Sequence, residues 1–133
     1  MLSRLDALAD ARRDFAFETT LAARSFGPWL RARRGTGYRV HLTFLGLPDA
    51  DTAVNRVADR VRRGGHAIPE PTIRRRYMAG LQNFHRVYRE IVDSWLLIDN
   101  GSATGPIYVA AQDPGRPLVI LDAPRWRRME RFR

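Results

Sequence analysis

The sequence of 133 residues contains neither cysteine nor lysine. Without cysteine, the chain cannot form disulfide bonds, use a catalytic thiolate or bind zinc through sulfur. Without lysine, it cannot contain a P-loop of the form Gly-x-x-x-x-Gly-Lys-Ser/Thr, and it cannot use Schiff-base or lysine-base chemistry. It also lacks a signal peptide and any apolar run of about 20 residues that could span a membrane. These absences lead us to expect a soluble, cytoplasmic protein.

Positive charge is abundant, and all of it is carried by arginine. The 23 arginines outnumber the 14 acidic residues and give a net charge of +9. A basic chain of this kind attracts phosphate backbones whatever their sequence, so non-specific nucleic-acid binding stays open as one interpretation. The length is typical of one domain, and we expect residues 1–133 to form a single domain.

The arginines are concentrated around a pair of glycines. Between residues 54 and 77, seven arginines and His66 surround Gly64-Gly65, against only Asp59 and Glu70. Planar, permanently charged guanidinium groups suit a phosphate-rich ligand. A Gly-Gly turn between two helices is also a candidate hinge, and lids that carry arginines can stabilise a transferring phosphoryl group and exclude water. The alternative is that these arginines form a solvated helix face.

Hydrophobic periodicity predicts an α/β fold with a mostly parallel sheet. We expect helices over 3–12, 21–33, 50–63, 69–92 and 124–132, strands over 14–20, 38–47 and 95–100, and a hairpin of 107–111 with 118–121. Ligands of such sheets bind outside the carboxyl ends of the strands. Two of the expected strands end there in polar groups, Glu18-Thr19-Thr20 and Asp99-Asn100.

Each polar candidate also has a structural interpretation. Glu18 could accept a hydrogen bond from a ligand hydroxyl with Thr20 assisting, or Thr19 or Thr20 could cap the next helix beside a solvated carboxylate. His66 could donate to a phosphate or simply belong to the turn. Asp99-Asn100 could be an ordinary strand end.

Other polar residues favour structural roles. We expect His41 to be structural within its strand and His85 to lie on the solvent side of its helix. No spacing of ligands typical of a metal site is present. The terminal Arg125-Trp126-Arg127-Arg128 could touch RNA by stacking and phosphate contacts, although solvated arginines on a helix explain it as well.

Several motifs in this order resemble the zeta toxin-like family of P-loop kinases. The resemblance covers most of residues 14 to 100 and rests on Asp14-Phe15-Ala16-Phe17-Glu18-Thr19-Thr20-Leu21, Gly37-Tyr38-Arg39-Val40-His41-Leu42, Arg56 to Tyr77 with its Gly64-Gly65-His66-x-Ile68-Pro69 core, Asn83, and Trp95-x-x-x-Asp99-Asn100. It implies a kinase-like fold with a central parallel sheet, the use of ATP and Mg²⁺, and a lid over about residues 56–77.

The resemblance also implies substrates, partners and residue roles. Zeta toxins phosphorylate a sugar hydroxyl of UDP-N-acetylglucosamine and are held inactive by an antitoxin protein. Carried onto this sequence, the acceptor-binding residues are Glu18, Thr19 and Thr20. The catalytic lid arginines are Arg60, Arg75 and Arg76. The residues expected to hold ATP phosphates are Arg56, His66 and Asn100.

The departure from the family pattern concerns catalysis. Family members begin with a strand and a P-loop, followed by an aspartate proposed as the base, and none of these is found in this sequence. We therefore expect a partial, N-terminally truncated kinase domain that is inactive alone, with either a gap or a new pairing between the strands at 15–18 and 39–47. The alternative is a non-enzymatic basic protein that binds nucleic acid or an acidic, antitoxin-like partner.

Overall fold

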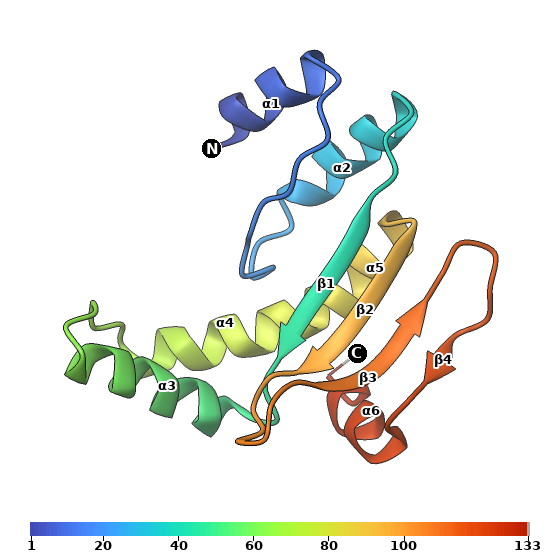
Figure 1. The fold of residues 1–133 in the computed structure, drawn as a ribbon. Coiled ribbons are helices and arrows are strands. Elements are labelled where there is room, and N and C mark those ends of the chain that lie inside the picture. The colour runs from blue at the N-terminus through green and yellow to red at the C-terminus, as the bar shows by residue number, and fades with distance from the viewer. Residues whose placement is uncertain (133) are drawn as a thin grey trace.

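The computed structural model describes residues 1–132 and has the expected α/β composition. Its elements are α1 (Leu2–Asp10), α2 (Phe26–Gly35), β1 (His41–Gly46), α3 (Ala50–Arg62), α4 (Glu70–Asn83), the π-helical turn η1 (Phe84–Tyr88), α5 (Arg89–Ile91), β2 (Ser94–Asp99), β3 (Ile107–Gln112), β4 (Val119–Ile120) and α6 (Ala123–Glu130). Figure 1 shows the sheet beside a hairpin of α3 and α4 that projects away from it. No helix in the described part of the chain is long and apolar enough to cross a membrane.

The sheet has four strands in the order β1-β2-β3-β4. β1 pairs with β2 in parallel, in a register that runs from His41 opposite Ser94 to Gly46 opposite Asp99. β3 is antiparallel to β2 and to β4, which confirms the expected hairpin. Within residues 1–132, parallel pairing is thus confined to β1 and β2, where α3 and α4 supply the long crossover that parallel strands require.

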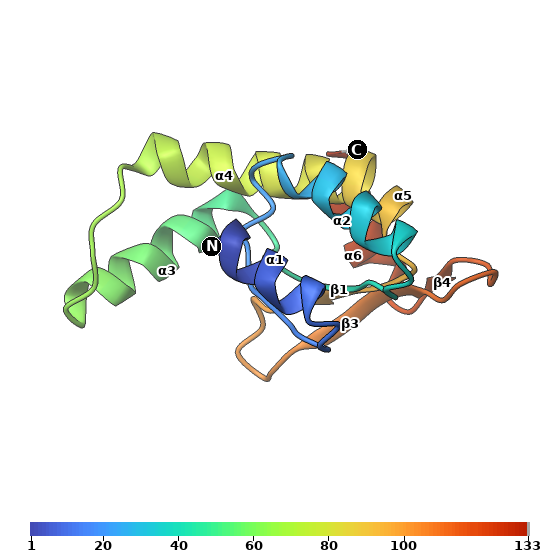
Figure 2. The same ribbon diagram turned by 90° about the horizontal axis from the view of Figure 1, so that it is seen from above.

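The hydrophobic core lies between one face of the sheet and the helices. Seen from above, α2, α4, α5 and α6 all lie on that side (Figure 2). Phe84, Tyr88, Leu97 and Val109 are fully buried there. Phe84 is the central side chain, because its ring stacks on Phe44 of β1 at 5.1 Å and meets Trp95 of β2 edge-on at 5.3 Å. One aromatic ring therefore ties η1 to both parallel strands.

The strand predicted over residues 14–20 is absent, and this prediction was wrong. Residues 14–20 have no helix or strand structure. Phe15 and Phe17 instead pack edge-on against Trp29 of α2 at 6.2 and 6.1 Å. A strand requires a neighbouring strand to pair with, and within residues 1–132 no strand forms a hydrogen-bonded ladder with this segment. The aromatic composition predicted a strand, but packing against Trp29 of α2 holds these side chains in place without strand pairing.

Local signals explain where the remaining helices begin. α2 starts at Phe26 rather than at Leu21, since Leu21 has a left-handed φ of 57° that no helix can contain. α4 begins just before Pro71 and continues through η1 and α5, which confirms the long second helix. The carboxylate of Asp49 caps α3, because its Oδ1 accepts hydrogen bonds from the amide and the hydroxyl of Thr52, both at 2.7 Å.

We expect Asp49→Ala to lower the free energy of unfolding by about 1 kcal/mol at pH 7, the usual cost of a lost cap. The Thr52 hydrogen bonds lower the pKa of Asp49 from its ordinary value of 3.8 in the folded state. The cap therefore contributes fully above the unfolded pKa and loses its contribution as the pH falls through the folded pKa. Urea unfolding at pH 7, 5 and 3 should show equal differences between wild type and variant at the first two values and a smaller one at pH 3. Asp49→Asn keeps a capping acceptor and serves as the control.

Candidate acceptor- and phosphate-binding site

Polar groups gather where β1 and β2 end. The amide of Asn100 donates to the carbonyl of Gly46 at 2.8 Å, which holds the two strand ends together. The buried Asp99 accepts from the amide of Gly101 at 2.8 Å and from Nε of Arg125 at 2.9 Å. Arg56 on α3 donates to the backbone carbonyl of Asn100. The structure thus brings together Arg56 and Asn100, two residues assigned to phosphate binding, through the Asn100 backbone.

The turn between α3 and α4 is a well-formed helix cap. Gly64 has φ 94°, and its amide donates to the carbonyl of Val61 at 3.0 Å. The amide of Gly65 donates to the carbonyl of Arg60 at 2.7 Å. These two bonds form a Schellman motif. A Cβ on Gly65 would lie 2.9 Å from that same carbonyl oxygen, so both glycines are required by the backbone here.

The arginines of this region fall into two groups. Arg74 pairs with Asp51 at 2.7 Å and with Glu70 at 2.9 Å, and Arg62 pairs with Asp59. Of these three ion pairs, Arg74–Asp51 joins α4 to α3, and the other two lie within one helix. The second group has exposed side chains that form no hydrogen bond or ion pair within residues 1–132, and consists of Arg60, Arg63, Arg75 and Arg76. All three proposed lid arginines belong to this second group and are available to a ligand.

The segment with the acceptor motif is exposed but anchored. Thr19 and Thr20 each accept a hydrogen bond at 3.3 Å from the amide two residues further on. The buried Asn83 donates through Nδ2 to the carbonyl of Leu21 at 2.7 Å. Neither threonine caps α2, whose N-cap is Ser25. The two hydroxyls shape the turn after Glu18, and the Glu18 carboxylate itself faces solvent.

α4 connects the acceptor segment with the lid arginines. A Cβ on Gly80 would lie 3.1 Å from the carbonyl oxygen of Thr20, so the segment lies directly on this glycine. Arg76, Gly80 and Asn83 follow the i, i+4, i+7 spacing of one helix face. Arg76 therefore lies on the face of α4 that Thr20 contacts. It is one helical turn from Gly80, about 6 Å along the helix axis.

The three histidines do not form a group. His66 is exposed in the turn between α3 and α4, whereas His41 lies on β1 and His85 in η1. His41 is exposed on β1, where its Nδ1 lies 2.7 Å from the Ser94 hydroxyl, in agreement with a structural role. His85 is buried at 3% exposure, against the prediction that it faces solvent. The reason is that α6 covers this side of η1 and places Trp126 5.5 Å from the His85 ring.

The described residues do not fit a Mg²⁺–phosphate centre. Within residues 1–132 no three His, Asp or Glu side chains come close enough to hold a metal ion. The strand-end carboxylate of Asp99 already has both oxygens engaged by Arg125 and Gly101. The sequence also has no lysine to contact ATP phosphates. The groups in this region that can bind a phosphate are the guanidinium groups of its arginines.

Sequence reasoning missed three residues that build the site. Asn83 was part of the motif but received no role. Arg125 was considered for RNA contacts or as a solvated arginine, although a buried strand-end carboxylate such as Asp99 requires a cation nearby. Tyr77 donates to the carbonyl of Leu47 at 3.0 Å, and burial is the main reason that its pKa rises to about 12. Asn83 and Tyr77 stood within the family motifs, and the signal for Arg125 was the need of Asp99 for a cation.

Comparison with known proteins identifies the family that the motifs of residues 14–100 resemble. The profile of the zeta toxin family matches residues 2–108. An uncharacterized protein of Haemophilus influenzae is 32% identical over 63 residues, which are 47% of this chain and 45% of that protein. The chain therefore matches less than half the length of this relative. No solved structure matches significantly.

Proposed function

The chain belongs to the zeta toxin family, and we propose that it carries the acceptor-binding and lid portion of an ATP-dependent phosphoryl-transfer site. The observation that carries this proposal is the face of α4 on which Arg76, Gly80 and Asn83 follow one another. Asn83 fixes the acceptor segment at Leu21, and Arg76 extends toward the same side. An arginine one helical turn from Gly80, on which the acceptor segment rests, is suitably located to contact a phosphoryl group transferred to an acceptor bound there.

Each group has a role within this proposal. Glu18 accepts a hydrogen bond from the hydroxyl of a small acceptor such as a UDP-amino sugar, with Thr19 and Thr20 shaping the turn beside it. Arg60, Arg75 and Arg76 contact the transferring phosphate, where fixed guanidinium groups stabilise developing negative charge. Arg56, His66 and Asn100 border the nucleotide phosphates. An antitoxin-like protein that covers these arginines is the expected macromolecular partner.

The same proposal predicts that residues 1–133 transfer no phosphate on their own. A P-loop lysine and backbone cradle normally hold the β- and γ-phosphates in line with the acceptor. This sequence has no lysine, and its exposed arginines can bind phosphate without fixing that alignment. Acceptor binding and phosphoryl transfer are therefore separable in this chain.

We expect Glu18→Gln to weaken the binding of UDP-N-acetylglucosamine by about 10- to 100-fold, because a hydrogen bond to a charged group contributes about 1.5–3 kcal/mol. Titration followed by amide chemical shifts of residues 18–24 measures this effect. Asp14→Asn removes another exposed carboxylate from the same segment and serves as the matched control. Equal affinity of the two variants, or no binding by the wild type at millimolar ligand, would contradict the acceptor role.

A second candidate function is non-specific nucleic-acid binding. The observation that favours it is that exposed arginines also occur outside the lid, at Arg127 and Arg128 of α6. In that case affinity for a single-stranded RNA should fall steeply with salt, because each neutralised phosphate releases counterions. Arg127→Gln/Arg128→Gln should then weaken RNA binding as much as the loss of two lid arginines does. The kinase-like proposal expects no measurable RNA binding at physiological salt.

A further inference from the structure

The outer edge of β4 is an open edge of the sheet. β4 is the last strand in the sheet order and pairs with β3 alone. Figures 1 and 2 show it on the far side of the molecule from the α3–α4 hairpin, with no other element beyond it. β4 also lies after residue 108, the last residue that the family profile matches.

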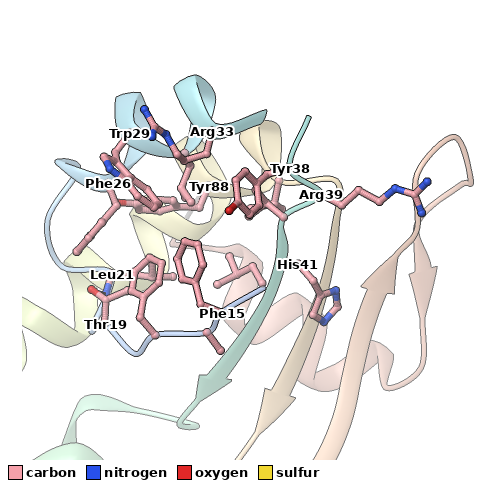
Figure 3. A pocket seen from close by; sticks show the side chains of 16 residues that line it. Phe15, Thr19, Leu21, Phe26, Trp29, Arg33, Tyr38, Arg39, His41 and Tyr88 are labelled. Atoms are coloured by element: carbon pink, nitrogen blue, oxygen red, sulfur yellow. Dashed lines mark hydrogen bonds between the residues drawn. The ribbon is translucent and has the colours of Figure 1, made fainter. Parts of the chain in front are cut away.

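The opposite edge of the sheet, along β1, is partly screened by the chain itself. Residues 14–21 and α2 lie beside the start of β1 and enclose an apolar cavity with it. Figure 3 shows Phe15, Trp29 and Tyr38 gathered around that cavity. The edge of β4 is therefore the one that another strand can reach without displacing residues 14–21.

Hydrogen bonding to β3 determines which groups of β4 point outward. The amide of Leu121 donates to the carbonyl of Val109 at 2.8 Å, so Leu121 is bonded to β3. Val119, two residues earlier, faces β3 in the same way. The amides and carbonyls of Leu118 and Ile120 then point away from the sheet. Within residues 1–132, no backbone–backbone hydrogen bond involves Leu118.

The side chains along this edge are apolar and exposed. Val119 has an exposed fraction of 50%, Ile120 of 45% and Leu121 of 57%. Leu118 packs against the core, so by alternation Val119 and Leu121 lie on the opposite face of the sheet. Pro117 does not block the edge, because the alternation turns its nitrogen toward β3. The edge thus offers a partner both backbone hydrogen bonds and apolar surface.

The sequence of this edge is complementary to itself. Its two ends carry opposite charges at equal distances from Val119, in the run Arg116-Pro117-Leu118-Val119-Ile120-Leu121-Asp122. In an antiparallel pair of two copies centred on Val119, Arg116 lies opposite the partner's Asp122. Leu118 lies opposite the partner's Ile120, so the outward amides and carbonyls bond to each other. A shift by two residues in either direction would place a charged residue opposite an apolar one.

The charged ends select this register. Arg116 is exposed. Oδ2 of Asp122 accepts from Nη1 of Arg125 at 2.7 Å, and the Asp122 side chain remains 22% exposed. A carboxylate has lone pairs for more than two donors, so a second guanidinium can approach it. Because exposed ion pairs add little affinity, the apolar side chains hold the two copies together and Arg116 favours one register over the others.

We propose that β4 pairs antiparallel with β4 of a second copy, centred on Val119, and forms a two-fold symmetric dimer with one continuous sheet. Val119 packs against the partner's Val119, and Leu121 packs against the partner's Pro117. A symmetric contact of this kind uses the same edge on both copies and therefore closes at the dimer. The α3–α4 hairpin lies on the far side of the molecule and stays accessible, so the dimer does not depend on the phosphoryl-transfer proposal (Figure 1).

The absence of cysteine allows a direct test by cross-linking. In the proposed pair, the two copies of Val119 form a non-hydrogen-bonded pair with Cα atoms about 4.5 Å apart, a distance that a disulfide can span. The full chain carrying Val119→Cys, oxidised with copper phenanthroline, should form a disulfide-linked dimer at least about tenfold faster than Leu121→Cys. Leu121→Cys is the matched control, because Leu121 is similarly exposed on the same face but lies opposite the partner's Pro117. Equal rates for the two variants, or no linked dimer from Val119→Cys, would overturn the proposal.

Sedimentation equilibrium tests the same contact without a thiol. The wild-type chain should show a monomer–dimer equilibrium, and Val119→Glu should weaken it at least about tenfold, because like charges would then lie directly opposite each other. Thr43→Glu on β1 is the control and should leave the equilibrium unchanged. Both variants lower the net charge of +9 equally, so general repulsion cannot explain a difference between them. Ile120→Pro removes an outward amide and should also weaken the dimer, whereas Ile120→Val should not.

Other outcomes would assign the edge to a different partner. A wild-type chain that stays monomeric up to millimolar concentration would overturn the proposal. Assemblies larger than the dimer would overturn it too, because they require a head-to-tail contact. Sedimentation of a monomeric chain with phosphatidylserine vesicles, lost in Val119→Glu, would assign the apolar edge to a membrane surface instead. The cross-linking rates decide the matter even if Ile120→Pro does not fold.

Discussion

Replacing Phe84 by alanine should lower the free energy of unfolding by about 3–5 kcal/mol, a large part of the total for a domain of this size. Phe84 has 0% exposure. Its ring contacts Phe44 at 5.1 Å, Trp95 at 5.3 Å and His85 at 5.0 Å. Alanine would leave a cavity bordered by β1, β2 and η1, and rigid aromatic neighbours cannot collapse into it.

Urea unfolding followed by circular dichroism measures this loss. Tyr108→Ala is the matched control, because Tyr108 is also an aromatic residue of the domain but is 57% exposed on β3. It should change the free energy of unfolding by about 0.5 kcal/mol or less. A loss below about 1 kcal/mol for Phe84→Ala would mean that η1 does not join the helices to the parallel strands as described.

Neutralising two lid arginines together, as Arg75→Gln/Arg76→Gln, should reduce the affinity for ATP by at least tenfold at low ionic strength. Both side chains are exposed and unpaired within residues 1–132. Each charge-assisted hydrogen bond to a phosphate contributes about 1.5–3 kcal/mol, and every 1.4 kcal/mol is a factor of ten in affinity. Stability should stay within about 0.5 kcal/mol of wild type, because no intramolecular contact is removed.

The control for this variant removes the same charge elsewhere. Arg127→Gln/Arg128→Gln takes two adjacent exposed arginines from α6 and leaves the α3–α4 hairpin unchanged. Isothermal titration of the two double variants with ATP should separate them clearly, with the α6 variant within about twofold of wild type. Equal losses would show that total charge governs binding, as a general polyanion binder would require.

Much of the fold could be predicted because its signals are local. The stripe of α3, its Asp49 cap and the Gly64-Gly65 stop all depend on residues within one or two helical turns. β1, β2 and the β3–β4 hairpin follow from short apolar runs between turn residues. The predicted strand at 14–20 failed because strand formation depends on a neighbour far away in sequence, and aromatic composition says nothing about whether one is present.

The assignment of site residues stays a prediction, and the structure shows only how exposed each of them is and which groups it contacts. The density of charge indicated all seven arginines of residues 54–77, the family resemblance selected Arg60, Arg75 and Arg76 among them, and the structure leaves these three exposed. The sequence could not distinguish them from Arg74, whose partner Asp51 is brought close by the hairpin, whereas Arg62 pairs within its own helix with Asp59, three residues earlier. The burial of His85 was missed for a related reason: its cover is Trp126 on α6, about forty residues later, and helical periodicity cannot reveal such a contact.

The separation of acceptor binding from phosphoryl transfer is tested most directly by a transfer assay with the purified chain, ATP labelled in the γ-phosphate, Mg²⁺ and UDP-N-acetylglucosamine. Sugar-nucleotide binding is followed in the same sample by amide chemical shifts of residues 18–24. We expect binding that depends on Glu18 and no label transferred to the sugar nucleotide, because arginines without a P-loop lysine do not align the phosphates. Repeated turnover that disappears with Arg75→Ala would contradict it, since the 133 residues would then contain a complete phosphoryl-transfer site.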